Sequence, residues 1–578
     1  MNKEKSVKSS IVNVLTKNKV YTIALIILII FVVVVGLIPP QILKHIIDYN
    51  FVDNKKDGLI TSALLYIFIV FLIGIFDFSK EAVLTVLGEK ITKEIRLDMM
   101  IKLEKINAIY FSKNESGQIV SRFTNDVDAI NSMFSSGIIS MIIDSFKIIG
   151  VVISIWAFSS KLGFITLCIL PLIYIITRMF QKRMLNAQIE SRKLIGKVNN
   201  HISESFKNIL MIKSFSKEEY MEESYKDVLM DNFEAVEKVN FYDSIFSPVV
   251  LLIRAVVIGL IVILSSQRIN FFGISLGMVA ASIDLISSLF TPVENLGIEL
   301  QSIQKSVSGI KRVNEFFNEK EDKKKNINEL ALDSKKLYFK FNDVSFSYDK
   351  RKNVLVDINL EIKPNENITF VGRTGVGKTT LFKLIAGLLR PTEGNITLNG
   401  INVYDIPNSE KRNILGYVEQ SFHMIKGTVA EQISLGDNNI SMEQVKKALD
   451  YVGLTDYINT LENKYDTFIN NENLFSQGQK QLLSIARAIV TDPPILLFDE
   501  ITANLDSITE DKIVSILQMA SQEHTILTIS HRLSSMISSD RIVILENGKI
   551  KNSGTPEELL QNDEWYKNHI ALEKLTWK

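Results

Sequence analysis

The sequence predicts two structural classes in series: an α-helical membrane domain of six transmembrane helices with cytoplasmic extensions, then an α/β domain built on a phosphate-binding loop. Two observations predict this order. Long apolar runs are concentrated between residues 20 and 300, whereas residues 338–578 have the mixed composition of a soluble α/β domain. Within that second part, residues 372–380 (GRTGVGKTT) are rich in glycine and lie between two apolar stretches. We therefore expect a membrane domain at 1–310, a linker at 311–337 and a second domain at 338–578.

The charge balance and the cysteine content exclude two classes of protein. The 578 residues include 65 Lys and Arg and 65 Asp and Glu, so the formal net charge is zero. A chain without excess positive charge lacks the field that attracts nucleic acid, and we expect no nucleic-acid partner. The single cysteine, Cys168, excludes an internal disulfide.

Six apolar segments are long enough to cross a bilayer, which takes about 20 helical residues for roughly 30 Å. We place them at 20–42, 59–78, 137–159, 162–181, 245–266 and 271–292. The first is longer than the apolar core of a signal peptide, which spans about 7 to 15 residues, so we interpret it as a membrane helix. Lys and Arg gather in the N-terminal stretch and in the connections 79–136 and 182–244. By the positive-inside rule, both termini are expected to be cytoplasmic.

The two long connections are too regular to be loops. Around residues 89–109 and 188–212, apolar positions recur every three and four residues, which is helical periodicity. The membrane helices are therefore expected to continue outside the bilayer as stalks of about 25 residues, or roughly 38 Å at 1.5 Å per residue. The tips of these stalks, residues 110–118 and 214–220, could then touch a cytoplasmic domain.

Four charged residues stand within the predicted spans: Asp144 and Lys147 in one, and Arg254 and Asp284 in two neighbouring ones. An ionised group at mid-bilayer costs at least about 2.5 to 3.5 kcal/mol, so each needs a reason to be there. Asp144 and Lys147 are three residues apart and can pair on one helix face. Arg254 and Asp284 either line a polar cavity or form a structural pair between helices.

Residues 372–380 fit the phosphate-binding pattern G-x-x-x-x-G-K-[ST]. Residues 367–371 predict the strand before the loop, and residues 381–389 predict the helix after it. The glycines let the backbone aim several N–H groups at phosphate oxygens, and the helix adds its positive N-terminal end. In such a loop Lys378 reaches the β- and γ-phosphates and Thr379 ligates Mg²⁺. The residues predicted to contact nucleotide here are Gly372, Arg373, Thr374, Gly375, Val376, Gly377, Lys378, Thr379 and Thr380.

A second apolar strand, predicted at 495–500, ends in two carboxylates, Asp499 and Glu500. Mg²⁺ prefers a few carboxylates together with phosphate oxygens, so Asp499 is a candidate metal ligand. Glu500 is placed to take a proton from the attacking water or to orient it. An acidic strand end alone is a weak signal, but together with the phosphate loop it predicts nucleotide hydrolysis.

These motifs, taken with others along residues 338–578, resemble the nucleotide-binding domain of an ABC transporter. The resemblance implies that Tyr348 stacks on adenine and that Gln420 senses and helps to hold Mg²⁺. It also implies that His531 contacts the γ-phosphate and that residues 503–506 (ANLD) cross to a second copy. The implied cofactors are ATP and Mg²⁺.

Residues 475–479 (FSQGQ) resemble the Leu-Ser-Gly-Gly-Gln signature of this family, which meets the nucleotide held by an opposite subunit. Ser476, Gly478 and Gln479 match the signature. Phe475 and Gln477 depart from it, and the loss of the first glycine puts the approach of the backbone to phosphate in doubt.

Because the signature acts on a second subunit and the chain holds one nucleotide-binding domain, the resemblance implies a dimer, either a homodimer or a heterodimer of two halves. Six spans fused ahead of one such domain resemble an exporter half-transporter in the cell membrane. We expect ATP-driven export of a hydrophobic or amphipathic small molecule, lipid or peptide by alternating access. A peptide-processing exporter is not expected, because no protease-like segment precedes the first span. The alternative is a regulatory or channel-like half that senses ATP without pumping.

Overall fold

The computed structural model describes residues 5–53, 58–267, 275–322, 337–349, 351–469, 474–501, 505–530, 536 and 538–576. The chain divides into two compact units. The first consists of Met1–Lys105 and Asn114–Glu319, and the second of Ile106–Lys113 and Lys320–Lys578. A short internal segment of the chain therefore leaves the first unit and joins the second.

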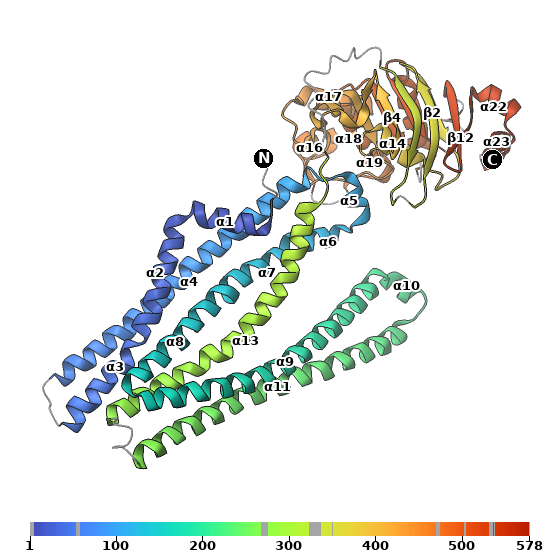
Figure 1. The fold of residues 1–578 in the computed structure, drawn as a ribbon. Coiled ribbons are helices and arrows are strands. Elements are labelled where there is room, and N and C mark those ends of the chain that lie inside the picture. The colour runs from blue at the N-terminus through green and yellow to red at the C-terminus, as the bar shows by residue number, and fades with distance from the viewer. Residues whose placement is uncertain are drawn as a thin grey trace. The chain divides into compact units, whose positions relative to one another are not determined.

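The first unit is helical throughout its described part (Figure 1). Its helices, including three π-helical segments labelled η1 to η3, are α1 (Val7–Lys17), α2 (Lys19–Gly36), α3 (Ile38–His45), η1 (Ile46–Val52), α4 (Leu59–Leu103), α6 (Ser116–Ser121), η2 (Arg122–Asp126), α7 (Val127–Ser132), η3 (Met133–Ile139), α8 (Ser140–Phe158), α9 (Ser160–Lys207), α10 (Ile209–Ser214), α11 (Glu218–Gln267) and α13 (Leu276–Asn318).

Six stretches of helix in the described residues are long and apolar enough to cross a membrane, which confirms the six predicted spans. They are Lys19–Val52, Leu59–Leu103, Ser116–Phe158, Ser160–Lys207, Glu218–Ile263 and Leu276–Asn318.

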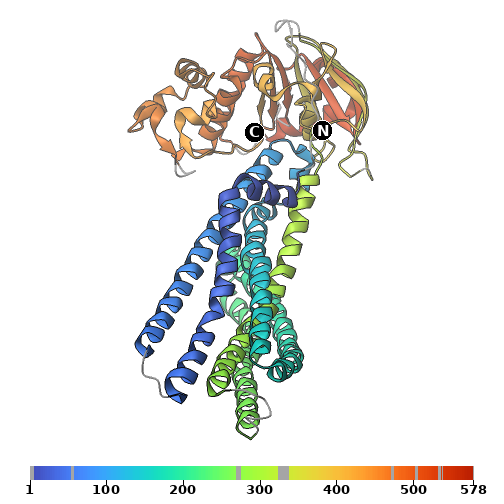
Figure 2. The ribbon, with the colours of Figure 1, turned by 60° about the vertical axis from the view of Figure 1, so that its left-hand side comes forward.

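The stalks are also helical, because α4, α9 and α11 run unbroken for 45, 48 and 50 residues. At 1.5 Å per residue each is roughly 70 Å long, more than twice the thickness of a bilayer core. In Figures 1 and 2, α9 and α11 lie side by side along their length. The predicted continuation of these spans as helices beyond the membrane is confirmed.

Apolar contacts join the helices of the first unit. Ile155 of α8 and Ile261 of α11 are buried in one cluster with Leu285, Ile286 and Leu289 of α13. Outside such clusters, many large apolar side chains of α2 and α4 are exposed. Exposed apolar surface of this extent is expected of helices that face lipid.

The described part of the second unit contains three sheets, of six, four and two strands. The strands are β1 (Phe339–Phe346), β2 (Leu355–Ile362), β3 (Asn367–Val371), β4 (Glu393–Leu398), β5 (Ile401–Asn402), β6 (Leu415–Val418), β7 (Gly427–Thr428), β8 (Phe468–Ile469), β9 (Ile495–Asp499), β10 (Thr525–Ile529), β11 (Arg541–Glu546) and β12 (Lys549–Gly554). The six-stranded sheet has the order β12-β11-β3-β10-β9-β6, and only its edge strand β12 is antiparallel to its neighbour. The second sheet, β2-β1-β4-β5, is antiparallel.

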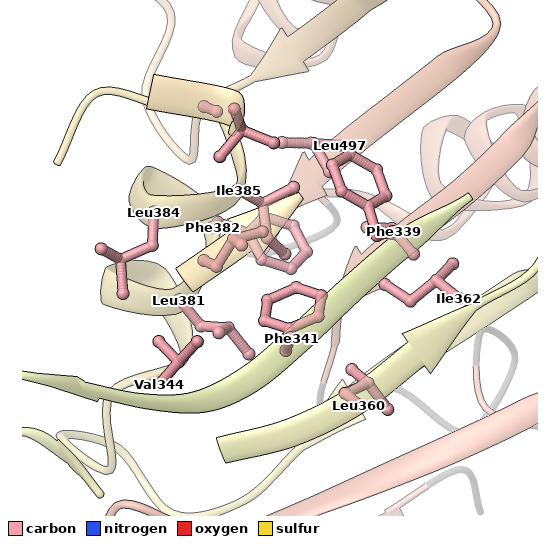
Figure 3. Packing of buried hydrophobic residues seen from close by; sticks show 14 of the residues in the cluster. Phe339, Phe341, Val344, Leu360, Ile362, Leu381, Phe382, Leu384, Ile385 and Leu497 are labelled. Atoms are coloured by element: carbon pink, nitrogen blue, oxygen red, sulfur yellow. The ribbon is translucent and has the colours of Figure 1, made fainter. Parts of the chain in front are cut away.

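The helical elements of this unit are α5 (Ala108–Lys113), α14 (Lys378–Ile385), η4 (Val403–Asp405), α15 (Asn408–Ile414), α16 (Val429–Ser434), α17 (Met442–Tyr451), α18 (Thr455–Thr460), η5 (Lys464–Asp466), α19 (Gln477–Ile489), α20 (Ser507–Ala520), α22 (Pro556–Asn562) and α23 (Glu564–Thr576). Helix α14 is central. Figure 3 shows its Leu381, Phe382 and Ile385 beside Phe339 and Phe341 of β1, in a cluster whose members are nearly inaccessible to solvent. This packing fixes the start of α14 against the ends of β3 and β9.

The segment 106–113 belongs to the second unit. Asn107 donates a side-chain hydrogen bond of 3.3 Å to the hydroxyl of Tyr404, and Ala108 and Ile109 pack against the core of the two sheets. Tyr110 is buried as well. The first four residues of the predicted stalk tip at 110–118 therefore belong to the second unit, and the rest belong to the first.

Candidate functional site

The loop between β3 and α14 forms a cradle in which three glycines have positive φ angles. The values are +149° at Gly372, +84° at Gly375 and +108° at Gly377. A Cβ atom at Gly372 would lie 2.3 Å from the carbonyl oxygen of Leu545, so only glycine fits there. Gly377 is the N-cap of α14 and provides no side-chain cap. The first N–H groups of α14 are therefore available to a ligand.

Lys378 begins α14 and is buried, with 5% of its surface exposed. Its Nζ donates to the carbonyl oxygens of Gly372 and Arg373, at 2.8 and 3.3 Å. Burial lowers the pKa of Lys378, while the charges of Glu500 and Asp499 oppose that shift. The ammonium group is thus held by backbone carbonyls at the mouth of the cradle.

Asp499 ends β9 beside the cradle. Its Oδ1 accepts a hydrogen bond of 3.3 Å from the hydroxyl of Thr379, and its Oδ2 one of 3.5 Å from Tyr417. Burial is the main cause that raises the pKa of Asp499, and the nearby charge of Glu500 adds to it. A buried carboxylate next to a hydroxyl, facing a phosphate cradle, is a donor set that suits Mg²⁺.

Glu500 follows Asp499 and has a φ angle of +50°, which is rare outside glycine. Its backbone N–H donates to the carbonyl of Ile529 at 3.0 Å, which holds this conformation. Its Oε2 accepts a hydrogen bond of 2.9 Å from Nε2 of Gln420. Strained backbone of this kind is common at functional sites. In this conformation the carboxylate of Glu500 bonds to Gln420.

A cavity of about 730 Å³ adjoins the cradle. Tyr348 lines it, and its hydroxyl lies 3.2 Å from Oγ1 of Thr380. Residues 373–376 of the cradle line it from another side. Trp565, from α23, also lines it. The sequence analysis missed Trp565, because it stands far along the chain from every motif and no pattern surrounds it.

The signature residues stand at the start of α19. Ser476 is its N-cap and forms a capping box with Gln479: the hydroxyl of Ser476 accepts from the N–H of Gln479 at 3.2 Å, and the Gln479 side chain accepts from the N–H of Ser476 at 2.9 Å. A Cβ at Gly478 would lie 2.7 Å from Cγ2 of Thr509, so this glycine allows α19 to approach Thr509.

The two departures from the signature have different surroundings. Phe475 is buried, with its ring in edge contact with Tyr457 at 5.6 Å between centroids. Gln477 is the first residue of α19 and is exposed. Neither substitution removes the N–H groups at the start of the helix.

The structure brings Thr379, Lys378 and Asp499 into one site, with Gln420 and Glu500 joined to each other beside Asp499. Among the described residues, no hydrogen bond links Ser476 or Gln479 to the cradle. His531 and residues 502–504, which include the first two residues of the ANLD loop, lie outside the described residues.

The charged residues of the spans are not paired as the sequence suggested. Asp144 accepts a hydrogen bond of 3.0 Å from Asn295 of α13, and the described part of the chain contains no ion pair between Asp144 and Lys147. Asp284 is exposed and forms no ion pair with Arg254 within the same described residues. The alternative of a structural Arg254–Asp284 pair is therefore not supported.

Comparison with known proteins gives consistent matches along the chain. Residues 22–293 match the family model described as ABC transporter transmembrane region, and residues 355–503 match the model described as ABC transporter. The chain is 31% identical over 557 residues to the lactococcin-G-processing and transport ATP-binding protein of Lactococcus lactis, covering 93% of this chain and 76% of that protein. It is 28% identical over 529 residues to the ATP-dependent lipid A-core flippase of Desulfotalea psychrophila, covering 90% of this chain and 91% of the relative.

A solved structure of a bacterial Atm1-family ABC exporter with ATP bound is similar in fold. The TM-score is 0.79 at 23% sequence identity, over 96% of this chain and 98% of that chain. The likeness covers both the helical unit and the α/β unit.

Proposed function

Because the chain belongs to the ABC transporter family as an exporter-type half-transporter, we propose that it exports a hydrophobic or amphipathic substrate across the cytoplasmic membrane by alternating access, as a dimer. Membership of the family makes it a multi-pass membrane protein whose ATP-binding domain couples ATP hydrolysis to transport. The observation that carries the finer proposal is the placement of Asp499 and Glu500 beside the cradle, with Glu500 joined to Gln420.

The site supports a hydrolytic role for named residues. Tyr348 would stack on the adenine, and the N–H groups of residues 372–380 would bind the phosphates. Lys378 would exchange its carbonyl partners for β- and γ-phosphate oxygens. Glu500 would accept a proton from the attacking water, held in position by Gln420. Tyr348 lines the cavity, and Lys378 is hydrogen-bonded to Arg373 of its wall. Glu500 and Gln420 are joined to each other by a hydrogen bond next to Asp499.

Thr379, Asp499 and Gln420 would hold Mg²⁺. The ion supplies positive charge that neutralises the phosphates during transfer. The protein contributes one hydroxyl, one buried carboxylate and one amide, and the remaining ligands would be phosphate oxygens and water. Burial raises the pKa of Asp499, and a bound cation would oppose that shift because it favours the ionised carboxylate. His531 is proposed to contact the γ-phosphate on the basis of the family resemblance.

One feature in each of the two units supports a dimer. Ser476 is exposed, and within the described residues it forms no hydrogen bond to the cradle of its own chain. This is expected if Ser476 contacts the nucleotide that a partner subunit binds. Near the end of the second stalk, Phe206 of α9, Leu210 of α10 and Phe215 are 73, 81 and 71% exposed. Exposed apolar groups at the end of a charged stalk mark an interaction surface. The intact Glu500 suits a homodimer or the active half of a heterodimer.

Orientation is proposed from charge alone: Lys and Arg are concentrated at the N-terminus and in the stalks, which places both termini in the cytoplasm. ATP would then be bound from the cytoplasm. Its higher affinity for the closed pair of nucleotide domains would shift the dimer toward the outward-open state.

The test is Mg²⁺-dependent ATP hydrolysis by this chain purified alone in lipid, beside a Glu500→Gln control. Turnover that the control abolishes would establish a self-sufficient homodimer. A folded sample that binds ATP without turnover would contradict the homodimer and direct the search to a partner half.

A further inference from the structure

Gln420, which bonds to Glu500, stands in a loop that has little regular structure of its own. The loop runs from the end of β6 at Val418 to the start of β7 at Gly427. Within the described part of the chain, residues 421–426 form no hydrogen bond between two backbone groups. Backbone groups of such a segment bond to side chains or to water, and only the side chains hold the loop in place. The side chains that bond to residues 421–426 therefore restrict the position of Gln420.

The part of the loop that leads into β7 is held by Gln432 of α16, which is fully buried. Its Oε1 accepts a hydrogen bond of 3.0 Å from the N–H of Ile425, and its Nε2 donates one of 2.7 Å to the carbonyl oxygen of the same residue. One side-chain amide thus satisfies both backbone groups of Ile425. This contact fixes the far end of the loop but not the end that carries Gln420.

The part of the loop next to Gln420 is held by Arg487 of α19. Nη1 of Arg487 donates to the carbonyl oxygen of His423 at 3.2 Å, and its guanidinium carbon lies 4.2 Å from the centre of the Phe422 ring. A guanidinium is attracted to an aromatic face and, because it is planar, can stack there while it donates hydrogen bonds. Only Ser421 separates Phe422 from Gln420. Arg487 therefore anchors the loop beside the residue that bonds to the catalytic carboxylate.

The same guanidinium joins the two anchors of the loop to each other. Nε of Arg487 donates to the carbonyl oxygen of Gln432 at 2.7 Å, while the side chain of Gln432 holds Ile425. Burial lowers the pKa of Arg487 to about 10, so the group is still charged at pH 7. Helix α19 also begins at its N-cap, Ser476. The loop that carries Gln420 is thus tied to the helix that begins at the signature.

A second arginine bonds to α16 without contacting the loop. Nη1 and Nη2 of Arg412, on α15, donate to the carbonyl oxygens of Ser434 and Ile433 at 2.7 and 2.6 Å. Burial lowers the pKa of Arg412 too. Among the described residues, Arg412 has no hydrogen bond, ion pair or ring contact with residues 421–426. It is a structural arginine with which Arg487 can be compared.

We propose that Arg487 is a positioning residue for ATP hydrolysis. It holds residues 421–426 so that Nε2 of Gln420 stays at hydrogen-bond distance, 2.9 Å, from the carboxylate of Glu500. Arg487 acts through Gln420 and not on the nucleotide itself. This role rests on the proposed function of Gln420 and Glu500 in hydrolysis.

The test is a double-mutant cycle on the full chain in lipid nanodiscs, measured as Mg²⁺-dependent ATP hydrolysis. Arg487→Lys keeps the charge but loses the planar group that stacks on Phe422 while it donates to two carbonyls. We expect it to lower kcat by about five- to tenfold and to leave the Kd for ATP within about twofold, because the cradle is unchanged. In a Gln420→Ala background, the same substitution should lower kcat by less than about twofold.

Arg412→Lys is the matched control, and it should lower kcat by less than about twofold although it weakens contacts to the same helix. Hydrogen exchange of residues 421–426, measured by mass spectrometry without nucleotide, reports on the loop directly. It should become faster in Arg487→Lys and stay unchanged in Arg412→Lys. If Arg487→Lys does not fold, Phe422→Leu, which removes the ring and leaves the backbone bonds, decides in the same way.

Three outcomes would overturn the proposal. They are losses of kcat that multiply in the double variant, an equal loss in Arg412→Lys, and unchanged exchange of the loop in Arg487→Lys. The thermal midpoint of every sample reports whether it is folded.

Export is measured separately, so the two proposals can fail independently. The expected cycle in a chain that moves no cargo would support the role of Arg487 and contradict the pump, whereas multiplying losses in a chain that does export would do the reverse. If the wild type alone does not hydrolyse ATP, the self-sufficient homodimer is contradicted. The cycle is then measured as the Mg²⁺ concentration that half-saturates ATP binding, since Gln420 is proposed to hold the ion.

Discussion

The helices α14 and α19 both present their N-termini where nucleotide phosphate is proposed to bind, but they begin in opposite ways. Helix α14 starts at Gly377, which has a φ angle of +108° and provides no side-chain cap. Helix α19 starts at Ser476, whose capping box with Gln479 satisfies donors at that end. The first N–H groups of α14 have no side-chain cap and are available to a ligand. The start of α19 is capped by its own side chains.

The two helix starts also differ in their surroundings: the cradle is packed against neighbouring backbone, and the signature is on the surface. Gly372 and Gly377 lie against the backbone of residues 354 and 545, so the cradle has one shape. Ser476 is exposed, and α19 can fold before any partner arrives. The comparison predicts that substitutions in the cradle and its carboxylates affect ATP directly, whereas substitutions at the start of α19 affect stability and the encounter with a second subunit.

The largest expected effect belongs to the cradle side. Glu500→Gln keeps the shape and the contact with Gln420 but removes the proton acceptor, so we expect ATP hydrolysis to fall by roughly 10² to 10⁴-fold. ATP affinity should change by less than about threefold. Turnover by the lipid-reconstituted protein is measured together with nucleotide binding. Glu523→Gln, an exposed glutamate, is the control, and a matching loss there would contradict a specific role for Glu500.

A methyl group in the cradle should weaken ATP binding according to where it is placed. At Gly372 a Cβ would lie 2.3 Å from a backbone oxygen, whereas at Gly375 it would meet nothing within 4 Å. We therefore expect Gly372→Ala to reduce ATP affinity by at least about tenfold, and Gly375→Ala to have a smaller effect that reflects only its φ angle of +84°. Equilibrium binding of a fluorescent ATP analogue measures both. Equal losses would mean that steric fit does not shape the loop.

Removal of the α19 cap should have a moderate effect, mostly on stability. Ser476→Ala deletes the hydroxyl that accepts from Gln479, which costs about 1 kcal/mol for a typical N-cap. Chemical denaturation followed by circular dichroism measures this cost. ATP binding by the isolated chain should be unchanged, since the cradle does not involve Ser476. Weaker ATP binding by the monomeric variant would contradict the proposal that Ser476 does not contact the ATP bound by its own chain.

Asp499→Asn should increase the stability of the folded protein, whereas Ser476→Ala decreases it. Burial raises the pKa of Asp499, so the folded metal-free protein holds a proton there more tightly than the unfolded chain, whose Asp pKa is about 3.9. The stability contributed by this group is therefore present below the unfolded pKa and is lost as pH rises through the folded pKa. Asp499→Asn avoids that loss, and at pH 7 without metal we expect the thermal midpoint to rise by about 2 to 4 °C.

The gain from Asp499→Asn should disappear as the pH is lowered toward the raised pKa, because the wild-type carboxyl then becomes neutral too. Differential scanning calorimetry between pH 4 and pH 8 tests this, with the exposed Asp511→Asn as control. A gain that is independent of pH would point to packing rather than charge.

The smallest effect is expected from the departure in the signature. Gln477→Gly restores the common pattern, but Gln477 is exposed at the first position of α19 and its side chain is not part of the capping box. ATP hydrolysis by the assembled transporter should change by less than about twofold, and stability by under about 1 kcal/mol. A large gain in turnover would show that backbone approach at residue 477 limits the native chain.

The sequence predicted correctly those parts of the site that are formed by consecutive residues. The strand predicted at 367–371 is β3 with the same bounds, and the strand predicted at 495–500 is β9, which ends one residue earlier at Asp499. The helix predicted at 381–389 begins earlier, at Lys378, because helical hydrogen bonding starts directly after Gly377. The glycines, Lys378 and Thr379 act within one loop, so their spacing alone expresses the geometry.

The membrane domain shows where that guidance ended. Composition identified Asp144 as a charged residue within a predicted span, but it did not identify the residue that pairs with it. The sequence also offered Lys147 as the partner of Asp144, since residues three apart share a helix face, yet Asn295 of a distant helix is the partner observed.

By itself, the sequence determined the six spans, their helical stalks, the phosphate cradle and the membership of a family, because each depends on local periodicity or on contiguous residues. Only the tertiary structure decided that segment 106–113 joins the α/β unit, that Trp565 lines the nucleotide cavity, and that Asp144 bonds to Asn295. Those facts depend on which helix faces pack together. Packing is set by the summed contacts of many side chains, and no local pattern in the chain records it.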